Sequence, residues 1–469
     1  MIRFTVGAVV TATTLAAPQV VGEHAQAQAD PPAPPNVIMI MTDDMRVDDL
    51  VALPKTEQLL GVPGNGADYT HAYVSLPLCC PSRATFLTGR YAHNHGVWDN
   101  DGTNGGFNAF DDSNTLPIWL QNAGYQTVML GKYLNRYGYP GSRGGPTYEP
   151  PGWTSWSALT GPSVWNYRNF NVNVNGTVQE VRNNYQTTDF TRRAVQEIRS
   201  RVASSDPMFM WLSLVAPHNA NGGPHVPAEP KYAGTSNVGA PKSAAFNEAD
   251  VTDKPSWIQK LPRLSRNDQQ QVIRLRRQRR DALRSVDDTV EKVVNELRTD
   301  GELDNTVIMF TTDNGFLLGE HRVHHDKRYP YEESVQVPLL IRGPGIDPGV
   351  HTEPVSNVDL APTIADLAGV TPGLDVDGMS MLDPIPNDRP LLLESPKPWA
   401  DAGMPAYAGV RQGRWRYIEY GQSSELYDLE GDPWQLRNRI SDPSLNQTKA
   451  DLAATLDGLR DCAGQQCRQ

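Results

Sequence analysis

Apolar residues fall into short continuous runs along the chain, and each run ends in polar residues. Residues 36–41 lead into Thr42-Asp43-Asp44, and residues 306–312 lead into Asp313-Asn314. Three more runs have this form: 125–130 before Gly131-Lys132, 208–215 before Pro217-His218, and 337–341 before Arg342-Gly343. Such runs are typical of strands buried on both faces of a parallel sheet. The polar residues should then gather at the carboxyl edge of the sheet, where open α/β folds place their sites.

Helical spacing of apolar residues appears between these runs, at residues 116–122, 188–201 and 266–297. In the longest segment, Val286, Val290, Val293 and Leu297 form one apolar stripe. Strands that alternate with helices predict a large α/β domain with a mostly parallel central sheet.

A Pro- and Asp-rich stretch at residues 383–389 predicts a domain boundary. Beyond it, residues 389–393, 407–410 and 414–420 have the character of short strands, and residues 451–459 have helical spacing. We therefore expect a catalytic α/β domain at residues 30–383 and a small antiparallel-sheet domain at residues 384–469.

The first 29 residues have the form of a secretory signal peptide. Met1-Ile2-Arg3 is a short basic start, residues 4–17 are mildly apolar, and Ala27-Gln28-Ala29 offers a cleavage site. An Ala-rich disordered tail is the alternative. No later stretch approaches the ~20 apolar residues of a membrane span. We therefore expect a secreted protein, in which Cys462 and Cys467 form a disulfide.

The chain has 469 residues and a net charge of -12, which argues against nucleic acid as a partner. One local basic run stands out, on the helix predicted at residues 266–297. It comprises Arg274, Arg276, Arg277, Arg279, Arg280 and Arg284. The run could dock an anionic glycan or form a solvated helix face. Aspartates nearby favour the solvated face.

Polar residues at the predicted strand ends suggest a metal site. Asp43, Asp44, Asp313 and Asn314 offer oxygen donors, which suit a hard cation, although paired Asp residues also form caps and turns. We expect Ca²⁺ rather than Mg²⁺, because Ca²⁺ tolerates irregular geometry.

Cationic and acid–base candidates follow the same strand ends and motifs. Arg83, Lys132 and Lys327 would provide positive charge for an anionic substrate, although such side chains are usually solvated. His218 would donate a proton to a leaving alcohol, and a plain surface histidine is the alternative.

The string Cys79-Cys80-Pro81-Ser82-Arg83, followed by Leu87-Thr88-Gly89-Arg90, resembles the signature of the type I sulfatases. A buried cysteine at a helix start is the structural alternative. In that family the first Cys is oxidised to formylglycine before the chain folds, which here implies Cys79 and a formylglycine-generating enzyme as a maturation partner. The hydrated aldehyde offers one hydroxyl to attack sulfur and a second whose deprotonation expels sulfate.

The resemblance continues through Gly319-Glu320-His321, Lys327 and Glu425-Leu426-Tyr427-Asp428. It implies an alkaline-phosphatase-like α/β sandwich with a small C-terminal domain. It also implies a set of site residues. By this resemblance Ca²⁺ binds Asp43, Asp44, Asp313, Asn314 and modified Cys79, and sulfate contacts Arg83, Lys132, His218 and Lys327.

Within the family the chain is most similar to the N-acetylglucosamine-6-sulfatases, through strings such as Gly131-Lys132-Tyr133-Leu134-Asn135. Many sulfatases carry His where this chain has Leu134, and Asn135 could replace that substrate contact. The expected substrate is a sulfated small molecule or glycan. Two rivals stay open: a phosphate or phosphonate monoester hydrolase of the same superfamily, and a non-catalytic binder of sulfated glycans if Cys79 stays unmodified.

Overall fold

The computed structural model describes residues 1–14, 34–201, 204 and 206–468. Residues Pro34–Gln469 form one compact unit. Residues 1–14 contain no helix or strand, and the cleavage site predicted at residues 27–29 lies outside the described residues. Among the described helices, none is long and apolar enough to cross a membrane.

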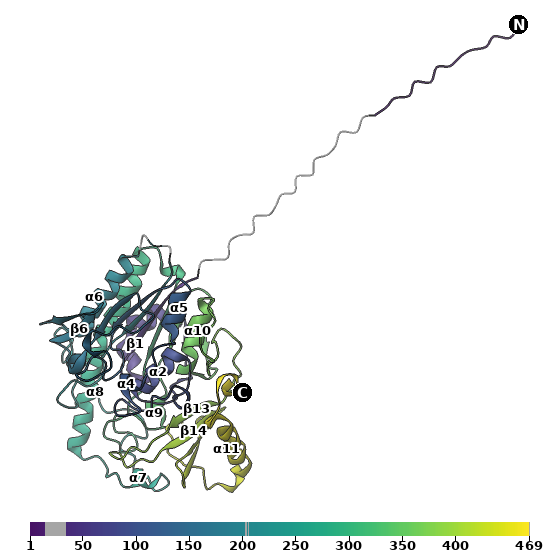
Figure 1. Cartoon of the computed structure of the whole chain (residues 1–469). Coiled ribbons are helices and arrows are strands. Elements are labelled where there is room, and N and C mark those ends of the chain that lie inside the picture. Colours follow the sequence, from purple (N-terminus) through teal and green to yellow (C-terminus); the bar gives the residue numbers. More distant parts are fainter. Residues whose placement is uncertain (15–33, 202–203, 205, 469) are drawn as a thin grey trace. The chain divides into compact units, whose positions relative to one another are not determined.

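A ten-stranded sheet forms the centre of the unit, in the order β11-β2-β10-β9-β1-β8-β4-β5-β6-β7 (Figure 1). Its middle strands β9 (Thr306–Thr312), β1 (Asn36–Thr42), β8 (Met208–Ser213) and β4 (Gln126–Gly131) are mutually parallel. The other strands are β5 (Ser155–Leu159), β6 (Phe170–Val174), β7 (Thr177–Val181), β10 (Leu340–Arg342), β2 (Ala67–Tyr69) and β11 (Gly349–His351). The expected mostly parallel sheet is confirmed in its middle, where the apolar runs lie.

One of the five runs was assigned the wrong direction. Residues 337–341 contribute only β10, which pairs antiparallel with β9. Its carboxyl end, with Arg342, therefore lies at the opposite edge from the ends of β1 and β9. An apolar run reports burial but not strand direction, which is why the sequence could not distinguish the two cases.

Helices cover both faces of the sheet (Figure 1). Ile38 and Ile40 of β1 share an apolar cluster with α8 (Arg266–Thr299), α6 (Gln186–Arg199) and α1 (Pro54–Leu60). Val37 and Met39 share the opposite cluster with α2 (Cys79–Thr88), α5 (Leu116–Asn122) and α10 (Leu360–Leu367). Alternate residues of a strand point to opposite faces, so a strand covered on both sides must be apolar throughout.

The basic run on α8 is not a solvated face. Arg276, Arg279 and Arg280 are buried. Arg276 pairs with Asp48 at 2.7 Å and Arg280 with Asp49 at 3.0 Å. The interpretation as a solvated face is therefore wrong for these three, because their partners come from the segment after β1, more than 200 residues away in sequence.

A four-stranded antiparallel sheet occupies the C-terminal part, as expected. It contains β13 (Leu391–Ser395), β14 (Tyr407–Gln412), β15 (Trp415–Glu419) and β16 (Ser424–Asp428), and α11 (Asn446–Arg460) contacts it. The Cys462–Cys467 disulfide is present. One apolar cluster joins this sheet to residues from the first hundred, including Leu76, Leu78 and Ala92. The boundary at residue 383 stays a prediction.

The remaining short elements connect these layers. They are α3 (Ala92–His95), α4 (Gly106–Ala109), α7 (Ser256–Gln259), α9 (Glu332–Val335), β3 (Ala72–Tyr73), β12 (Val355–Ser356) and eight short 3-10 helices, counted over the described residues.

Candidate active site

The ends of β1 and β9 bring four oxygen-donor residues together. Thr42 pairs with Thr312 in the parallel register, so the residues that follow each strand are neighbours. The backbone N–H of Asp44 donates to Asp313 Oδ1 at 3.0 Å, and Asn314 Nδ2 donates to Asp44 Oδ1 at 2.7 Å. Asp44 has a φ of 68°, a conformation that is costly outside glycine and that recurs at functional sites.

Cys79 is the first residue of α2 and is fully buried. Its thiol donates to Asp43 Oδ1 at 3.5 Å, and Lys327 Nζ donates to its Sγ at 2.8 Å. Burial, followed by the charge of Asp43, raises the pKa of the Cys79 thiol far above its usual value. The unmodified thiol is therefore protonated and a poor nucleophile.

Each carboxylate at this edge has a cationic partner. The pairs are Asp43 with Lys132 at 2.5 Å, Asp313 with Arg83 at 2.8 Å, and Asp44 with Lys327. The six side chains are buried. In the dry interior such pairs hold one another in place, and three negative charges balance three positive ones.

The ion pairs fix the protonation of these groups. Burial opposes ionisation of Asp43, but Lys132 and His218 lower its pKa to about 2. Burial likewise opposes the charge of Arg83, while Asp313 and Asp43 raise its pKa above the usual value. The pKa of Lys327 is raised in the same way, chiefly by Asp44 against burial. Asp43, Arg83 and Lys327 therefore stay charged at neutral pH.

Arg83 also organises the backbone around the site. Its Nη1 donates to the Lys132 carbonyl at 2.9 Å and to Ser213 Oγ at 2.6 Å. This ties the ends of β4 and β8 to helix α2. Arg279 of α8 acts similarly from the other face, because its guanidinium donates to the carbonyls of Asp44 and, at 3.2 Å, Pro217.

His218 lies where the segment after β8 meets the carboxylates. Its Nε2 is 3.6 Å from Asp44 Oδ2, and its ring stacks on Trp165 with centroids 4.2 Å apart. The Lys132 ammonium lies 4.6 Å from the centroid of the same tryptophan. Burial lowers the pKa of His218, although Asp43 and Asp44 oppose that shift. Trp165 was not predicted, because no motif marks the short 3-10 helix that carries it.

The residues present fit a metal ion. Ligand atoms of Asp43, Asp44, Cys79 and His218 all lie within 4.8 Å of one another. Asn314 Oδ1 is buried and has no hydrogen-bond partner in the described part of the chain. A buried oxygen without a donor is what a cation would satisfy. The predicted ligand set stays a prediction. His218 lies in the group of close atoms with three predicted ligands, and Asp313 accepts from the backbone N–H of Asp44.

Asn135 lies beside the neighbouring cysteine. Its backbone N–H donates to Cys80 Sγ at 2.9 Å, and its side-chain Oδ1 is buried without a partner among the residues described. On the other side, Asn100 Oδ1 accepts from the Cys80 N–H at 2.8 Å and fixes the start of α2. The predicted contact of Asn135 with substrate stays a prediction. Asn100 was not predicted, because it lies in a polar loop without a motif.

Comparisons with known proteins agree with this geometry. Residues 35–370 match the sulfatase family model, and residues 319–462 match the C-terminal model of N-sulphoglucosamine sulphohydrolase. The N-acetylglucosamine-6-sulfatase of Capra hircus is 34% identical, over 92% of this chain and 85% of the relative. The extracellular sulfatase SULF-1 homolog of Drosophila melanogaster is 36% identical, over 81% of this chain and 33% of the relative.

Solved structures show the same fold. A protein in complex with its substrate D-glucosamine-2-N,6-O-disulfate superposes with a TM-score of 0.74 at 24% identity, covering 90% of this chain and 97% of that one. The phosphonate monoester hydrolase of Agrobacterium radiobacter superposes with a TM-score of 0.68 at 22% identity, covering 91% and 95%. At these identities the structures support the fold alone. The match to the family model and the curated relatives goes further: this chain belongs to the sulfatase family and is a sulfuric ester hydrolase.

Proposed function

We propose that this sulfatase hydrolyses sulfate monoesters of glucosamine-type sugars, using Cys79 in its formylglycine form and a bound Ca²⁺. The observation that carries the proposal is the surroundings of Cys79. A buried thiol that is itself unreactive begins a helix between a carboxylate and an ammonium group. Such a position suits a side chain that becomes the nucleophile only after modification.

The proposed Ca²⁺ ligands are Asp43, Asp44, Asp313, Asn314 and the modified side chain of Cys79. When bound, a divalent cation would polarise a sulfate oxygen and favour the hydroxyl form of the nucleophile. The three internal ion pairs leave the protein groups near neutrality, so the ion would give the site a net positive charge for an anionic substrate. The oxygen-rich donor set favours Ca²⁺ over Mg²⁺, because Mg²⁺ needs a near-octahedral shell.

Formylglycine at Cys79 would supply a hydrated aldehyde with two hydroxyls on one carbon. The surrounding residues act on this group and on the substrate. Lys132 and Lys327 hold positive charge at the sulfate oxygens, and Arg83 keeps the strand ends at fixed positions through its backbone bonds. Charges fixed in a dry site need no reorganisation as negative charge develops.

The leaving alcohol requires a proton, for which we propose His218. Stacking on Trp165 holds the ring in one orientation. The lowered pKa makes the protonated ring a stronger acid, although a smaller fraction carries the proton at neutral pH.

Two relatives support glucosamine 6-sulfate as the substrate class. One is named N-acetylglucosamine-6-sulfatase, and one solved structure holds a 6-O-sulfated glucosamine. Asn135 is the proposed sugar contact, because its buried Oδ1 lacks a donor among the residues that the structure describes. We further propose that the chain is secreted after removal of residues 1–29, as the name of its Drosophila relative supports.

Sulfate release from N-acetylglucosamine 6-sulfate, compared with hydrolysis of an aryl sulfate and an aryl phosphate, tests the proposal. We expect the two sulfates to be hydrolysed with higher kcat/KM than the phosphate. Preference for the phosphate would favour a phosphomonoester or phosphonate-ester hydrolase instead. Mass spectrometry of the Cys79 peptide supplies the second readout, because formylglycine replaces sulfur by oxygen and loses hydrogen. Unmodified cysteine without turnover would instead indicate a binder of sulfated glycans.

A further inference from the structure

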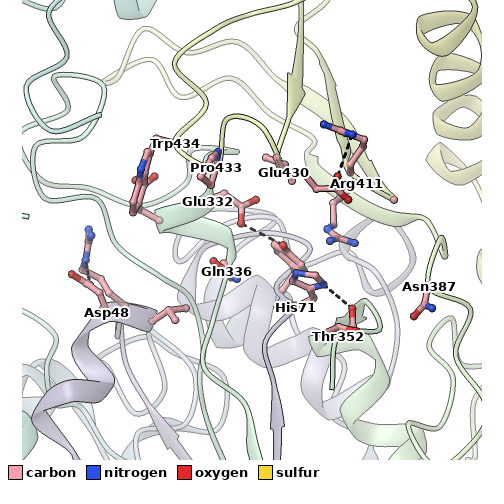
Figure 2. A pocket seen from close by; sticks show the side chains of 17 residues that line it. Asp48, His71, Glu332, Gln336, Thr352, Asn387, Arg411, Glu430, Pro433 and Trp434 are labelled. Atoms are coloured by element: carbon pink, nitrogen blue, oxygen red, sulfur yellow. Dashed lines mark hydrogen bonds and ion pairs between the residues drawn. The ribbon is translucent and has the colours of Figure 1, made fainter. Parts of the chain in front are cut away.

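A cavity of about 540 Å³ lies between α9 and the loops of the C-terminal sheet. Its walls come from the segment after β1, from β3 and α9, and from the β14–β15 hairpin together with residues 429–434. Figure 2 shows Trp434 on one side of the cavity and Arg411 towards the other. We call it the Trp434 pocket. The residues that line it do not include Cys79, the proposed metal ligands or the cations of the active site.

Most charged groups around the Trp434 pocket already have partners. Arg46 pairs with Glu320 at 2.8 Å and with Asp48 at 2.7 Å. Arg414 pairs with Asp428 and, at 3.1 Å, with Glu430. The charges within these pairs balance, so these residues do not need a ligand to neutralise them.

Arg411 is the exception. Its side chain is only 5% exposed, and its buried Nε and Nη1 have no hydrogen-bond partner in the part of the chain that the structure describes. Its guanidinium carbon lies 5.2 Å from the ring centroid of Tyr73, whose hydroxyl donates to Glu332 Oε2 at 3.3 Å. A buried guanidinium without a carboxylate is expensive unless something else accepts its N–H groups. Its planar fork matches the oxygens of a carboxylate or a sulfate.

The opposite wall offers different chemistry. Trp434 is 41% exposed and follows Pro433, so an apolar ring face lines the pocket. Glu333 Oε2 is buried and lacks a partner among the described residues, and Gln336 adds an amide. An aromatic face beside a few fixed polar groups is the composition of a small-molecule site. A pocket that has an apolar ring face, groups that can bond to hydroxyls and one arginine for an oxyanion suits an acidic sugar.

We propose that the Trp434 pocket binds a pyranose that carries an anionic group. The carboxylate or sulfate would contact Arg411, the sugar ring would lie on Trp434, and hydroxyls would bond to Glu333 and Gln336. A cavity of about 540 Å³ falls within the size range of small-ligand sites and suits one or two sugar units. The proposal concerns binding without hydrolysis, and it does not depend on the chemistry at Cys79.

Calorimetry with the full chain and three methyl glycosides tests the proposal. Methyl β-D-glucuronide carries a carboxylate and no sulfate ester, so it cannot be a substrate of the sulfatase site. Methyl β-D-glucoside is the neutral control. Methyl β-D-glucoside 6-sulfate, measured in a Cys79→Ser background to prevent turnover, distinguishes a sulfate ligand from a carboxylate ligand. The variants are Arg411→Gln, Trp434→Ala and, as the matched control, Arg414→Gln, which alters a pocket arginine that already has partners.

At least one acidic sugar should bind about tenfold more tightly than the neutral glucoside. Arg411→Gln should remove that preference, Trp434→Ala should weaken binding of every sugar, and Arg414→Gln should change little. Trp434 is exposed, so its variant keeps the test valid if Arg411→Gln fails to fold. The proposal is overturned if neither acidic sugar binds, if the neutral sugar binds equally well, or if Trp434→Ala leaves binding unchanged.

Discussion

His93 should make the stability of this protein depend on pH. Both ring nitrogens face acceptors: Nδ1 lies 2.9 Å from Glu394 Oε2, and Nε2 lies 2.9 Å from the Cys462 carbonyl, with Asn94 Nδ2 further from it at 3.2 Å. Only the doubly protonated ring can donate to both. Burial opposes the charge, but the hydrogen bond and charge of Glu394 raise the pKa of His93 from 6.5 to about 9. The protonated ring thus joins α3 to β13 and to the disulfide loop.

The sign and size of the contribution of His93 to the free energy of unfolding follow from this pKa. A group with a raised folded-state pKa stabilises the fold fully below its unfolded pKa, here 6.5, and loses that contribution as pH rises through about 9. At about 1.36 kcal/mol per pKa unit, the contribution is at most about 3–4 kcal/mol. The side chain is only 16% exposed, so solvent screens it weakly.

Urea unfolding between pH 6 and about pH 10 provides the measurement. The free energy of unfolding of wild type should fall relative to that of His93→Gln as pH rises from 6.5 to about 9. Below pH 6.5 the difference between the two proteins should stay constant. His225→Gln, at an exposed histidine, serves as the control. If the free energies of unfolding of wild type and His93→Gln differ by a constant amount across the whole pH window, His93 is not held in its protonated form by Glu394 and the Cys462 carbonyl.

Four further predictions concern the active site. Cys79→Ser should lower multiple turnover of an aryl sulfate by on the order of 1,000-fold or more, because a cysteine-specific converting enzyme cannot act on serine. Turnover by the control variant Cys80→Ser should stay within about tenfold of wild type. A larger loss of turnover in Cys80→Ser than in Cys79→Ser would contradict the assignment of Cys79. Chelation should abolish turnover, and added Ca²⁺ should restore it better than Mg²⁺; full activity after metal stripping, verified by elemental analysis, would count against the site. Asp313→Asn should lower stability by about 2 kcal/mol in urea unfolding, because Arg83 loses its nearer charged partner and keeps only the longer contact with Asp43. The variant should also bind less metal, and unchanged metal content would remove Asp313 from the ligand set. Arg279→Met should lower both kcat and the free energy of unfolding, the latter by about 1–3 kcal/mol, since two buried carbonyls lose their donor; a variant with wild-type kcat would show that this support is dispensable.

The central strands could be predicted because burial on both faces leaves only apolar residues. The run at residues 306–312 coincides with β9. The exposed strand β7 has no such pattern, since most of its side chains face solvent, and it was not predicted. β16 was noticed as a motif but not as a strand, because only its three middle residues are buried, which is too short an apolar run to mark a strand.

The positions of the polar groups could also be predicted, but not their partners. Parallel neighbours bring their carboxyl ends to one edge, which places Asp44 beside Asp313. The pairing of Arg83 with Asp313 joins residues 230 positions apart, and Arg279 reaches Asp44 across 235 positions. Contacts of this kind depend on how helices pack against the sheet, and no local pattern encodes them.

The apolar cluster shared between Leu76, Leu78, Ala92 and the C-terminal sheet has a consequence for synthesis. Its later members, such as Leu393 and Tyr427, leave the ribosome more than 300 residues after Cys79 has emerged. Until then the apolar side chains that flank the start of α2 lack the part of their cluster that the C-terminal sheet supplies. At roughly 5–20 residues per second this delay lasts tens of seconds. The proposed converting enzyme would therefore meet Cys79 before this cluster is complete, and the last strands to be made would close that access.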